Sequence, residues 1–128
     1  MFDHFGFCVR DLGAARRFYE EAMAALGLAV IDNTAASFLV IRSIDEPLPF
    51  LWIGTDRPAF WRDGHGASTS PVHLCFTARD REAVDTFHRR AVAAGGSDNG
   101  APGPRREAYY GAYVLDPDGN NVEAGYRG

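Results

Sequence analysis

The sequence contains an internal repeat, and this feature restricts the possible folds more than any other. Residues 4–27 (HFGFCVRDLGAARRFYEEAMAALG) align without gaps with residues 73–96 (HLCFTARDREAVDTFHRRAVAAGG), and ten of the 24 positions are identical. In a repeat architecture each copy buries its hydrophobic face against its neighbour. At 128 residues the chain has the length of one domain. We therefore expect a single domain made of two copies of one supersecondary unit.

Each copy opens with a predicted strand whose two faces differ. Bulky apolar side chains alternate with a histidine and small residues, as in a strand with one buried face. The bulky face carries Phe5, Phe7 and Val9 in the first copy, and Val72, Leu74 and Phe76 in the second. The opposite face carries His4, Gly6 and Cys8, and then His73, Cys75 and Thr77. We expect the bulky face to pack beneath a helix and the histidine face to stay open.

A helix and further strands are expected after each opening strand. Asp11 and Asp80 are suited to cap the helix N-termini, and Gly27 and Gly95 to follow the C-termini. Strands are predicted at residues 28–32, 37–43, 50–54, 109–115 and 121–126. The Gly- and Pro-rich residues 96–108 indicate an irregular flap. The pattern predicts an α+β fold, with one module over about 1–54, a linker over about 55–70 and a second module over about 71–128.

Composition excludes several classes of protein. The net charge of −4 without a block of like charges argues against nucleic acid or an anionic membrane as a partner. No apolar run approaches the 18 or so residues that a membrane span needs. The N-terminus lacks the pattern of a secretory signal, which favours a cytoplasmic location. Two cysteines are too few for a disulfide framework. Nucleic acid and anionic membranes are therefore set aside as partners.

Two histidines and a glutamate are predicted to converge. The repeat relates His4 to His73, so both should face the hollow that the two sheets enclose. Glu123 alternates with Val122 and Ala124, and if these pack against a helix the carboxylate points into the same hollow. A buried, unpaired carboxylate costs several kcal/mol. A divalent metal bound by all three would remove that cost, and such a ligand set suits Fe, Mn, Zn or Ni.

The predicted pocket has further candidate lining residues. Cys8, Cys75 and Thr77 share the histidine faces, and the cysteines are either buried small residues or thiolate ligands. Asn121 shares the face of Glu123. Trp52 stands opposite Glu123 when FLWIG (50–54) is aligned with NVEAG (121–125), and either lines the pocket or packs in the core.

Two residues of the second copy complete the candidates for substrate contact. If Asp116 pairs with Gly119 in the hairpin, Tyr110 shares a face with Glu123 and can donate a hydrogen bond to substrate. A one-residue bulge would select Tyr109 or Tyr113 instead. Arg106, beside the predicted flap, either meets a substrate carboxylate or is a solubility charge.

Three segments resemble a known family. The stretches HFGFCVRDLGAARRFYEEAMAALGL, HLCF and LDPDGNNVEA are similar to the vicinal oxygen chelate superfamily, which includes glyoxalase I, extradiol dioxygenases and bleomycin-binding proteins. The resemblance implies two βαβββ modules in a curved, barrel-like mixed sheet around a metal-binding concavity. It also implies a homodimer, and ligands at His4, His73 and Glu123.

The resemblance leaves three functions open. Trp52 stands where glyoxalase I enzymes have a carboxylate, so a three-ligand set favours a dioxygenase that coordinates two neighbouring oxygens of its substrate. A glyoxalase-type lyase or isomerase is the first alternative. The second is a metal-free protein of the bleomycin resistance type that sequesters a small molecule.

Overall fold

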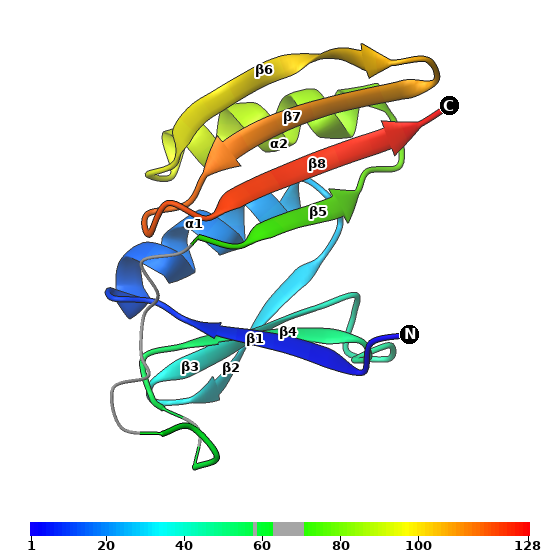
Figure 1. Cartoon of the computed structure of the whole chain (residues 1–128). Coiled ribbons are helices and arrows are strands. Elements are labelled where there is room, and N and C mark those ends of the chain that lie inside the picture. The colour runs from blue at the N-terminus through cyan, green and yellow to red at the C-terminus, as the bar shows by residue number, and fades with distance from the viewer. Residues whose placement is uncertain (58, 63–70) are drawn as a thin grey trace.

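Two four-stranded sheets, each with one helix, form the molecule (Figure 1). The computed structural model describes residues 1–57, 59–62 and 71–128. Module one comprises β1 (His4–Cys8), α1 (Leu12–Ala24), β2 (Ala29–Thr34), β3 (Ser37–Ile41) and β4 (Phe50–Gly54). Module two comprises β5 (His73–Thr77), α2 (Arg81–Ala93), β6 (Ser97–Arg106), β7 (Tyr109–Leu115) and β8 (Asn121–Arg127). The predicted α+β class and the twofold strand–helix–strands order are confirmed.

The sheets have the same topology. Module one orders its strands β1-β4-β3-β2 and module two β5-β8-β7-β6, so the first and last strands of each module are parallel neighbours. In this position the last strand of each module lies beside its opening histidine strand. β1 and β5 are edge strands and are not paired with each other. The described residues of the chain therefore form two open, mixed sheets, which agrees with the paired βαβββ modules that were expected.

The helix ends follow from local chemistry. The carboxylates of Asp11 and Asp80 accept hydrogen bonds from the backbone N–H groups of Ala14 and Ala83, at 2.9 and 2.8 Å. Each cap satisfies a donor that has no partner inside the helix. Gly27 has a φ of 74°, a conformation that glycine adopts without steric cost where the chain leaves α1.

The core lies between the helices and the bulky faces of the strands. α1 and α2 contact each other, and their buried residues include Phe18, Tyr19 and Phe87. Phe7 of β1 and Val9, just after it, belong to the same core, as do Val122 and Ala124 of β8. The bulky faces thus pack largely as predicted, with Phe5 as an exposed exception, and the histidine-bearing faces point away from the helices.

The segment after α2 differs from the prediction. Residues 96–108 were expected to be an irregular flap, but Ser97–Arg106 forms β6, which pairs antiparallel with β7. β6 is an edge strand, where a proline need not donate to a neighbour, and its pairing is interrupted by register shifts. This explains how Pro102 and Pro104 fit into a strand.

A buried polar link joins the modules. The hydroxyl of Tyr19, on α1, donates to the carboxylate of Asp116, in the turn between β7 and β8, at 2.7 Å. Asp116 also accepts from the backbone N–H groups of Asp118 and Asn120, at 2.9 and 2.8 Å. At the same turn, Arg10 pairs with Asp118 at 2.8 Å. The turn of module two is thus docked onto module one.

The linker predicted over residues 55–70 lies in part outside the described residues, which omit 58 and 63–70. Within the described ranges, none of the helices combines the length and apolar character that a membrane span requires.

Candidate functional site

Glu123 occupies the position that the alternation of β8 predicts. Its neighbours Val122 and Ala124 are fully buried in the core, whereas Glu123 faces the opposite side and is 5% exposed. The parallel pairing of β5 with β8 places Cys75 directly beside it. A buried acid on a sheet face therefore lies next to the first strand of its own module, where its neighbours can compensate for lost hydration.

His73 and Glu123 form the centre of the site. The Nε2 atom of His73 lies 3.2 Å from Oε2 of Glu123. The other ring nitrogen, Nδ1, is 3.1 Å from the backbone carbonyl oxygen of Asn121. If Nδ1 carries the proton and donates to that carbonyl, the lone pair of Nε2 points toward the carboxylate side, as in metal-binding histidines. Two of the three predicted ligands are thus brought together within one chain.

Tyr109, not Tyr110, reaches the glutamate. The hydroxyl of Tyr109 donates to Oε1 of Glu123 at 2.5 Å. Tyr110 lies on the opposite face, where its hydroxyl donates to Asp85 of α2 at 2.7 Å and Arg81 covers its ring. The prediction that Tyr110 faces the site is wrong by one residue of register.

The error in register arises in the hairpin turn. The backbone N–H of Gly119 bonds to the carbonyl of Asp116, as in the predicted type I turn, but the strands close with Asp116 opposite Asn120. Gly119 has a φ of 87°, and a type I turn followed by a left-handed glycine inserts one extra residue into the hairpin. Tyr113 consequently lies opposite Glu123. The glycine after the turn was the signal that could have identified Tyr109.

A pair of glycines makes room for the tyrosine. Gly111 and Gly125 are paired across β7 and β8. A Cβ atom on Gly125 would lie 2.1 Å from the Tyr109 hydroxyl, and one on Gly111 would lie 3.2 Å from Oε1 of Glu123. The absence of side chains here lets the phenol ring lie across β8 and contact the carboxylate.

The site keeps its tyrosine and thiol protonated. Burial first, and then hydrogen bonds with Cys75 and Glu123, raise the pKa of the Tyr109 phenol above its ordinary range. Burial also raises the pKa of the Cys75 thiol, whose sulfur is 3.4 Å from the Tyr109 hydroxyl. Tyr109 therefore remains a hydrogen-bond donor across the physiological pH range.

His4 does not join this cluster within the chain. Its Nδ1 lies 2.7 Å from the carboxylate of Asp3, and its ring stacks on Phe50 at 4.8 Å. The side chain is 57% exposed. The described residues contain no group of three His, Cys, Asp or Glu side chains that could hold a metal ion. The expected meeting of His4, His73 and Glu123 is therefore not made by one chain.

Trp52 fills the place in module one that Glu123 fills in module two. It pairs with Gly6 on β1, just as Glu123 pairs with Cys75 on β5, so the equivalence inferred from the repeat is confirmed. The indole lies over Gly6 and Gly54, because a Cβ on either would be 3.3 or 2.7 Å from its ring carbons. Trp52 is only half-buried and lies on the histidine face of its sheet.

The other residues that were predicted to contact the substrate do not all lie beside the site. Cys75 and Thr77 line cavities beside the site. Cys8 is buried, and its thiol donates to the backbone carbonyl of Asp56 at 3.5 Å, so it packs at the end of β1. Arg106 is exposed and lies over the ring of Tyr109.

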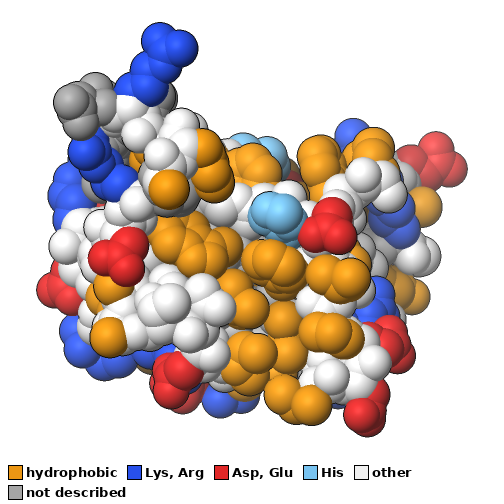
Figure 2. Space-filling view, turned by 90° about the horizontal axis from the view of Figure 1, so that it is seen from below, with side chains coloured by type: hydrophobic (Ala, Val, Ile, Leu, Met, Phe, Trp, Pro, Cys, Tyr) orange, Lys and Arg blue, Asp and Glu red, His pale blue; other side chains and the backbone are white. Residues whose placement is uncertain are grey.

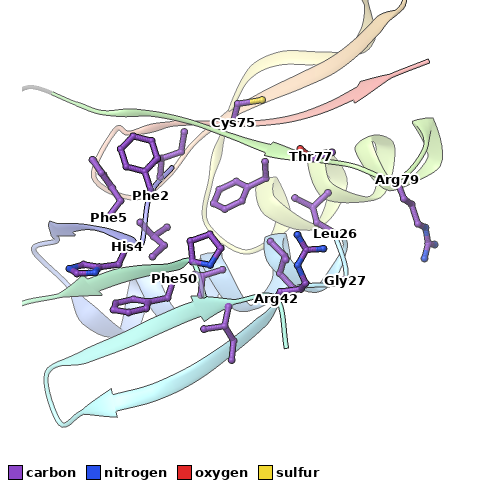
Figure 3. Close-up of a pocket in the computed structure, with 17 residues that line it drawn as sticks. Phe2, His4, Phe5, Leu26, Gly27, Arg42, Phe50, Cys75, Thr77 and Arg79 are labelled. Atoms are coloured by element: carbon purple, nitrogen blue, oxygen red, sulfur yellow. The ribbon is translucent and has the colours of Figure 1, made fainter. Parts of the chain in front are cut away.

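A large cavity opens between the two modules. Its volume is about 710 Å³, and it is lined by β1 and β4 on one wall and by β5 on the other. Figure 3 places His4 and Cys75 on opposite walls of this cavity. Seen from the side of module one, hydrophobic side chains gather around a histidine (Figure 2). The exposed residues of this kind include Phe2 and Phe5.

Known proteins share the sequence pattern and the fold. The chain matches a glyoxalase/bleomycin resistance protein from Albidiferax ferrireducens T118 with 32% identity and a TM-score of 0.76, over 100% of this chain and 99% of that one. A glyoxalase-related enzyme from Fulvimarina pelagi matches with 22% identity and a TM-score of 0.77, over 99% and 88%. Lactoylglutathione lyase from Agrobacterium tumefaciens matches with 22% identity and a TM-score of 0.67, over 98% and 92%.

No match is found among the curated proteins. The sequence profile of the Glyoxalase/Bleomycin resistance protein/Dioxygenase superfamily, however, matches residues 1–124. The profile covers both modules, including β1, β5 and most of β8, which carry the candidate site. The chain belongs to the glyoxalase/bleomycin resistance protein/dioxygenase superfamily.

Proposed function

We propose that the protein is a divalent-metal-dependent enzyme that binds two neighbouring oxygens of a small molecule, with a dioxygenase-type reaction. The observation that carries the proposal is the pair formed by His73 and Glu123, whose Nε2 and Oε2 atoms are 3.2 Å apart on adjacent strands. An imidazole and a buried carboxylate this close, beside an open cavity, suit a divalent ion. The choice among Fe, Mn, Zn and Ni is left to measurement.

The surroundings of both histidines support metal binding. His73 is held at Nδ1 by Asn121, whose backbone carbonyl oxygen and side-chain amide nitrogen both lie 3.1 Å away, and His4 is held at Nδ1 by the carboxylate of Asp3. Hydrogen bonds of this kind fix the tautomer and the ring orientation of metal-binding histidines. Both side chains are more than half exposed, which leaves Nε2 accessible. The two imidazoles are thus prepared in the same way, although they lie in different sheets.

The third ligand is His4 from a second copy of the chain. Within one chain, no further His, Cys, Asp or Glu side chain among the described residues completes a metal-binding group with His73 and Glu123. His4 is exposed on an edge strand. A homodimer that sets module one of each copy against module two of the other would complete two sites. The exposed apolar side chains of Phe2 and Phe5, beside His4, would be covered in such a dimer.

Trp52 favours the dioxygenase type over the glyoxalase type. The indole occupies the fourth ligand position, so the ligand set has one carboxylate and leaves positions for substrate oxygens. When bound, the ion acts as a Lewis acid that stabilises negative charge on those oxygens. Tyr109 donates to Glu123 and holds its carboxylate in place. A glyoxalase-type lyase remains the second candidate, since the Agrobacterium neighbour carries that name.

A mixing experiment tests the shared site. His4→Ala and Glu123→Ala proteins, purified without a histidine tag, are each expected to lose metal binding in calorimetric titrations with Mn²⁺ and Zn²⁺. After subunit exchange, each mixed dimer regains one intact site, because one chain supplies His4 and the other supplies His73 and Glu123. A mixture of His73→Ala with Glu123→Ala is the control, since both changes fall on the same half and no site can be restored.

Each other outcome contradicts a specific part of the proposal. Metal binding that fails to recover in the first mixture would place the site within one chain. A wild-type protein that binds neither ion, nor Fe²⁺ or Ni²⁺, would favour the metal-free binding protein instead. With the metal established, oxygen uptake on a panel of catechols is the expected activity. Turnover of methylglyoxal with a thiol, without oxygen uptake, would favour the lyase.

A further inference from the structure

We infer that a cationic pocket beside Tyr109 binds an anionic group of the substrate through Arg127, so that the substrate is a small carboxylate or phosphonate with an apolar body. The inference rests on the proposed function, because it adds a substrate class to the same site. It begins from a second cavity of about 400 Å³ that is separate from the Glu123 carboxylate. The lining residues are Cys75, Thr77, Ala78, Arg79, Tyr109, Gly125, Tyr126 and Arg127.

The pocket is open because of the same glycine that admits the tyrosine. Gly125 lies in its floor, and Thr77 and Ala78, at the end of β5, are small. The phenol ring of Tyr109 forms a wall, and its hydroxyl donates to Glu123. Glu123 is not among the residues that line this pocket.

Two guanidinium groups lie on this one ring. The Cζ atom of Arg127 is 4.6 Å from the centre of the Tyr109 ring, and that of Arg106 is 4.8 Å from it. The register pairs Tyr109 with Arg106 on β6 and with Arg127 on β8, so the two cations approach the ring from the strands on either side of β7. Of the two, Arg127 lines the pocket.

Arg106 and Arg127 differ from Arg16 and Arg90 in having no carboxylate partner among the described residues. Arg16 pairs with Glu20 and Asp32, and Arg90 pairs with Glu21. In the described part of the chain, neither Arg106 nor Arg127 forms an ion pair with a carboxylate. In a protein with a net charge of −4, Arg127 lines the cavity without a carboxylate partner among the described residues and is therefore available for a ligand.

Arg127 itself lines the pocket, so an anion bound there would lie beside its guanidinium. An Arg guanidinium is also suited to carboxylate and phosphonate oxygens, because it can bind two of them at once.

The apolar part of the substrate is inferred from the neighbouring cavity. The cationic pocket and the 710 Å³ cavity share Cys75, Thr77 and Arg79, so they adjoin along β5. The larger cavity is lined mostly by apolar side chains, among them Phe50 and Phe76. A planar apolar body in that cavity and an anionic group beside Arg127 would fill both spaces.

The experiment measures the binding of benzoate, phenylphosphonate and neutral benzamide to the full-length protein by calorimetry in metal-free buffer. We expect the two anions to bind and benzamide to bind at least about tenfold more weakly. Arg127→Gln should weaken the anions by about tenfold or more and leave benzamide unchanged. Arg89→Gln is the matched control, because it removes an equal charge from the exposed face of α2. It should leave all three affinities unchanged.

Equal binding of benzoate and benzamide, equal effects of the two arginine variants, or no binding of the anions would overturn the inference. Titration of Mn²⁺ into the Arg127→Gln protein separates this result from the proposed function, since His73 and Glu123 are intact in that variant. If benzoate binding depends on Arg127 but no metal binds, the proposed metal site is contradicted and the anion pocket is supported. If metal binds but benzoate does not, the anion pocket is contradicted and the metal site is supported.

Discussion

The same position in the two modules holds different chemistry. In module one, Trp52 lies beside the opening strand over Gly6 and Gly54. In module two, Glu123 occupies the matching place, and Tyr109 lies over Gly125 to reach it. The two modules therefore share a strand pairing and a glycine, two residues after the matching position, that is covered by an aromatic ring. The residue at the matching position differs: it is the indole of Trp52 in module one and the carboxylate of Glu123 in module two.

The largest expected effect is a difference in metal affinity between a variant of Glu123 and a variant of Trp52. Glu123→Ala should lower the affinity for Mn²⁺ and Zn²⁺ by at least about 100-fold, because it removes an anionic ligand, and even supporting residues of metal sites are worth 10- to 100-fold. Trp52→Ala should leave metal affinity unchanged, because an indole supplies no ligand. Calorimetric titration of both variants checks this. Equal losses would show that the two positions do not differ in function.

A second prediction concerns the glycine beneath Tyr109. Gly125→Ala places a Cβ 2.1 Å from the Tyr109 hydroxyl, so the phenol must move and release Glu123. We expect metal affinity to fall by about tenfold to 100-fold. Gly103→Ala is the control, because the nearest atom to its Cβ would be 4.0 Å away, at the end of Arg105. If Gly125→Ala and Gly103→Ala bind metal equally well, the support from Tyr109 is unnecessary.

A third prediction addresses the link between the modules. Tyr19→Phe removes the hydroxyl that donates to the buried carboxylate of Asp116. Loss of one partner from a buried acceptor should lower the free energy of unfolding by about 1–3 kcal/mol. Urea denaturation measures the change. Tyr126→Phe, in which the ring is only half-buried, should change it less. An unchanged midpoint for Tyr19→Phe would mean that the turn is held by its backbone bonds alone.

The smallest expected effect compares the two thiols. Burial raises the pKa of both Cys8 and Cys75, so at neutral pH both are protonated and slow to react. Asp56 raises the pKa of Cys8 further, whereas Arg127 opposes the increase at Cys75. The rate of alkylation by iodoacetamide should therefore rise with pH beyond 9.0 in single-cysteine proteins. Cys75 should react faster because it is also exposed.

Adding Arg127→Gln to the protein that retains Cys75 should slow its alkylation several-fold at a given pH, because the raised pKa leaves less thiolate. An unchanged rate would mean that the guanidinium does not act on the pocket. The protein that retains Cys8 is the internal control, since its thiol bonds to the carbonyl of Asp56.

The sequence predicted the scaffold more accurately than the site. The alternation in β1 and β8 identified which side chains enter the core, because a buried face selects apolar residues at every second position. Asp11 and Asp80 were identified as helix caps from local chemistry alone. The flap expected after α2 was a strand instead, since the edge of a sheet tolerates prolines that would disrupt an inner strand. Tyr110 was chosen over Tyr109 because one extra residue in the turn reverses the faces.

The sequence by itself determined the duplicated architecture, the faces of the strands and the sheet face that carries both His73 and Glu123. These depend on short-range patterns that repeat along the chain. Only the tertiary structure decided that His4 stays apart from them, that Tyr109 contacts the acid and that two arginines share its ring. These features depend on how separate sheets are placed and on a single residue of register, and neither leaves a periodic signal in the sequence.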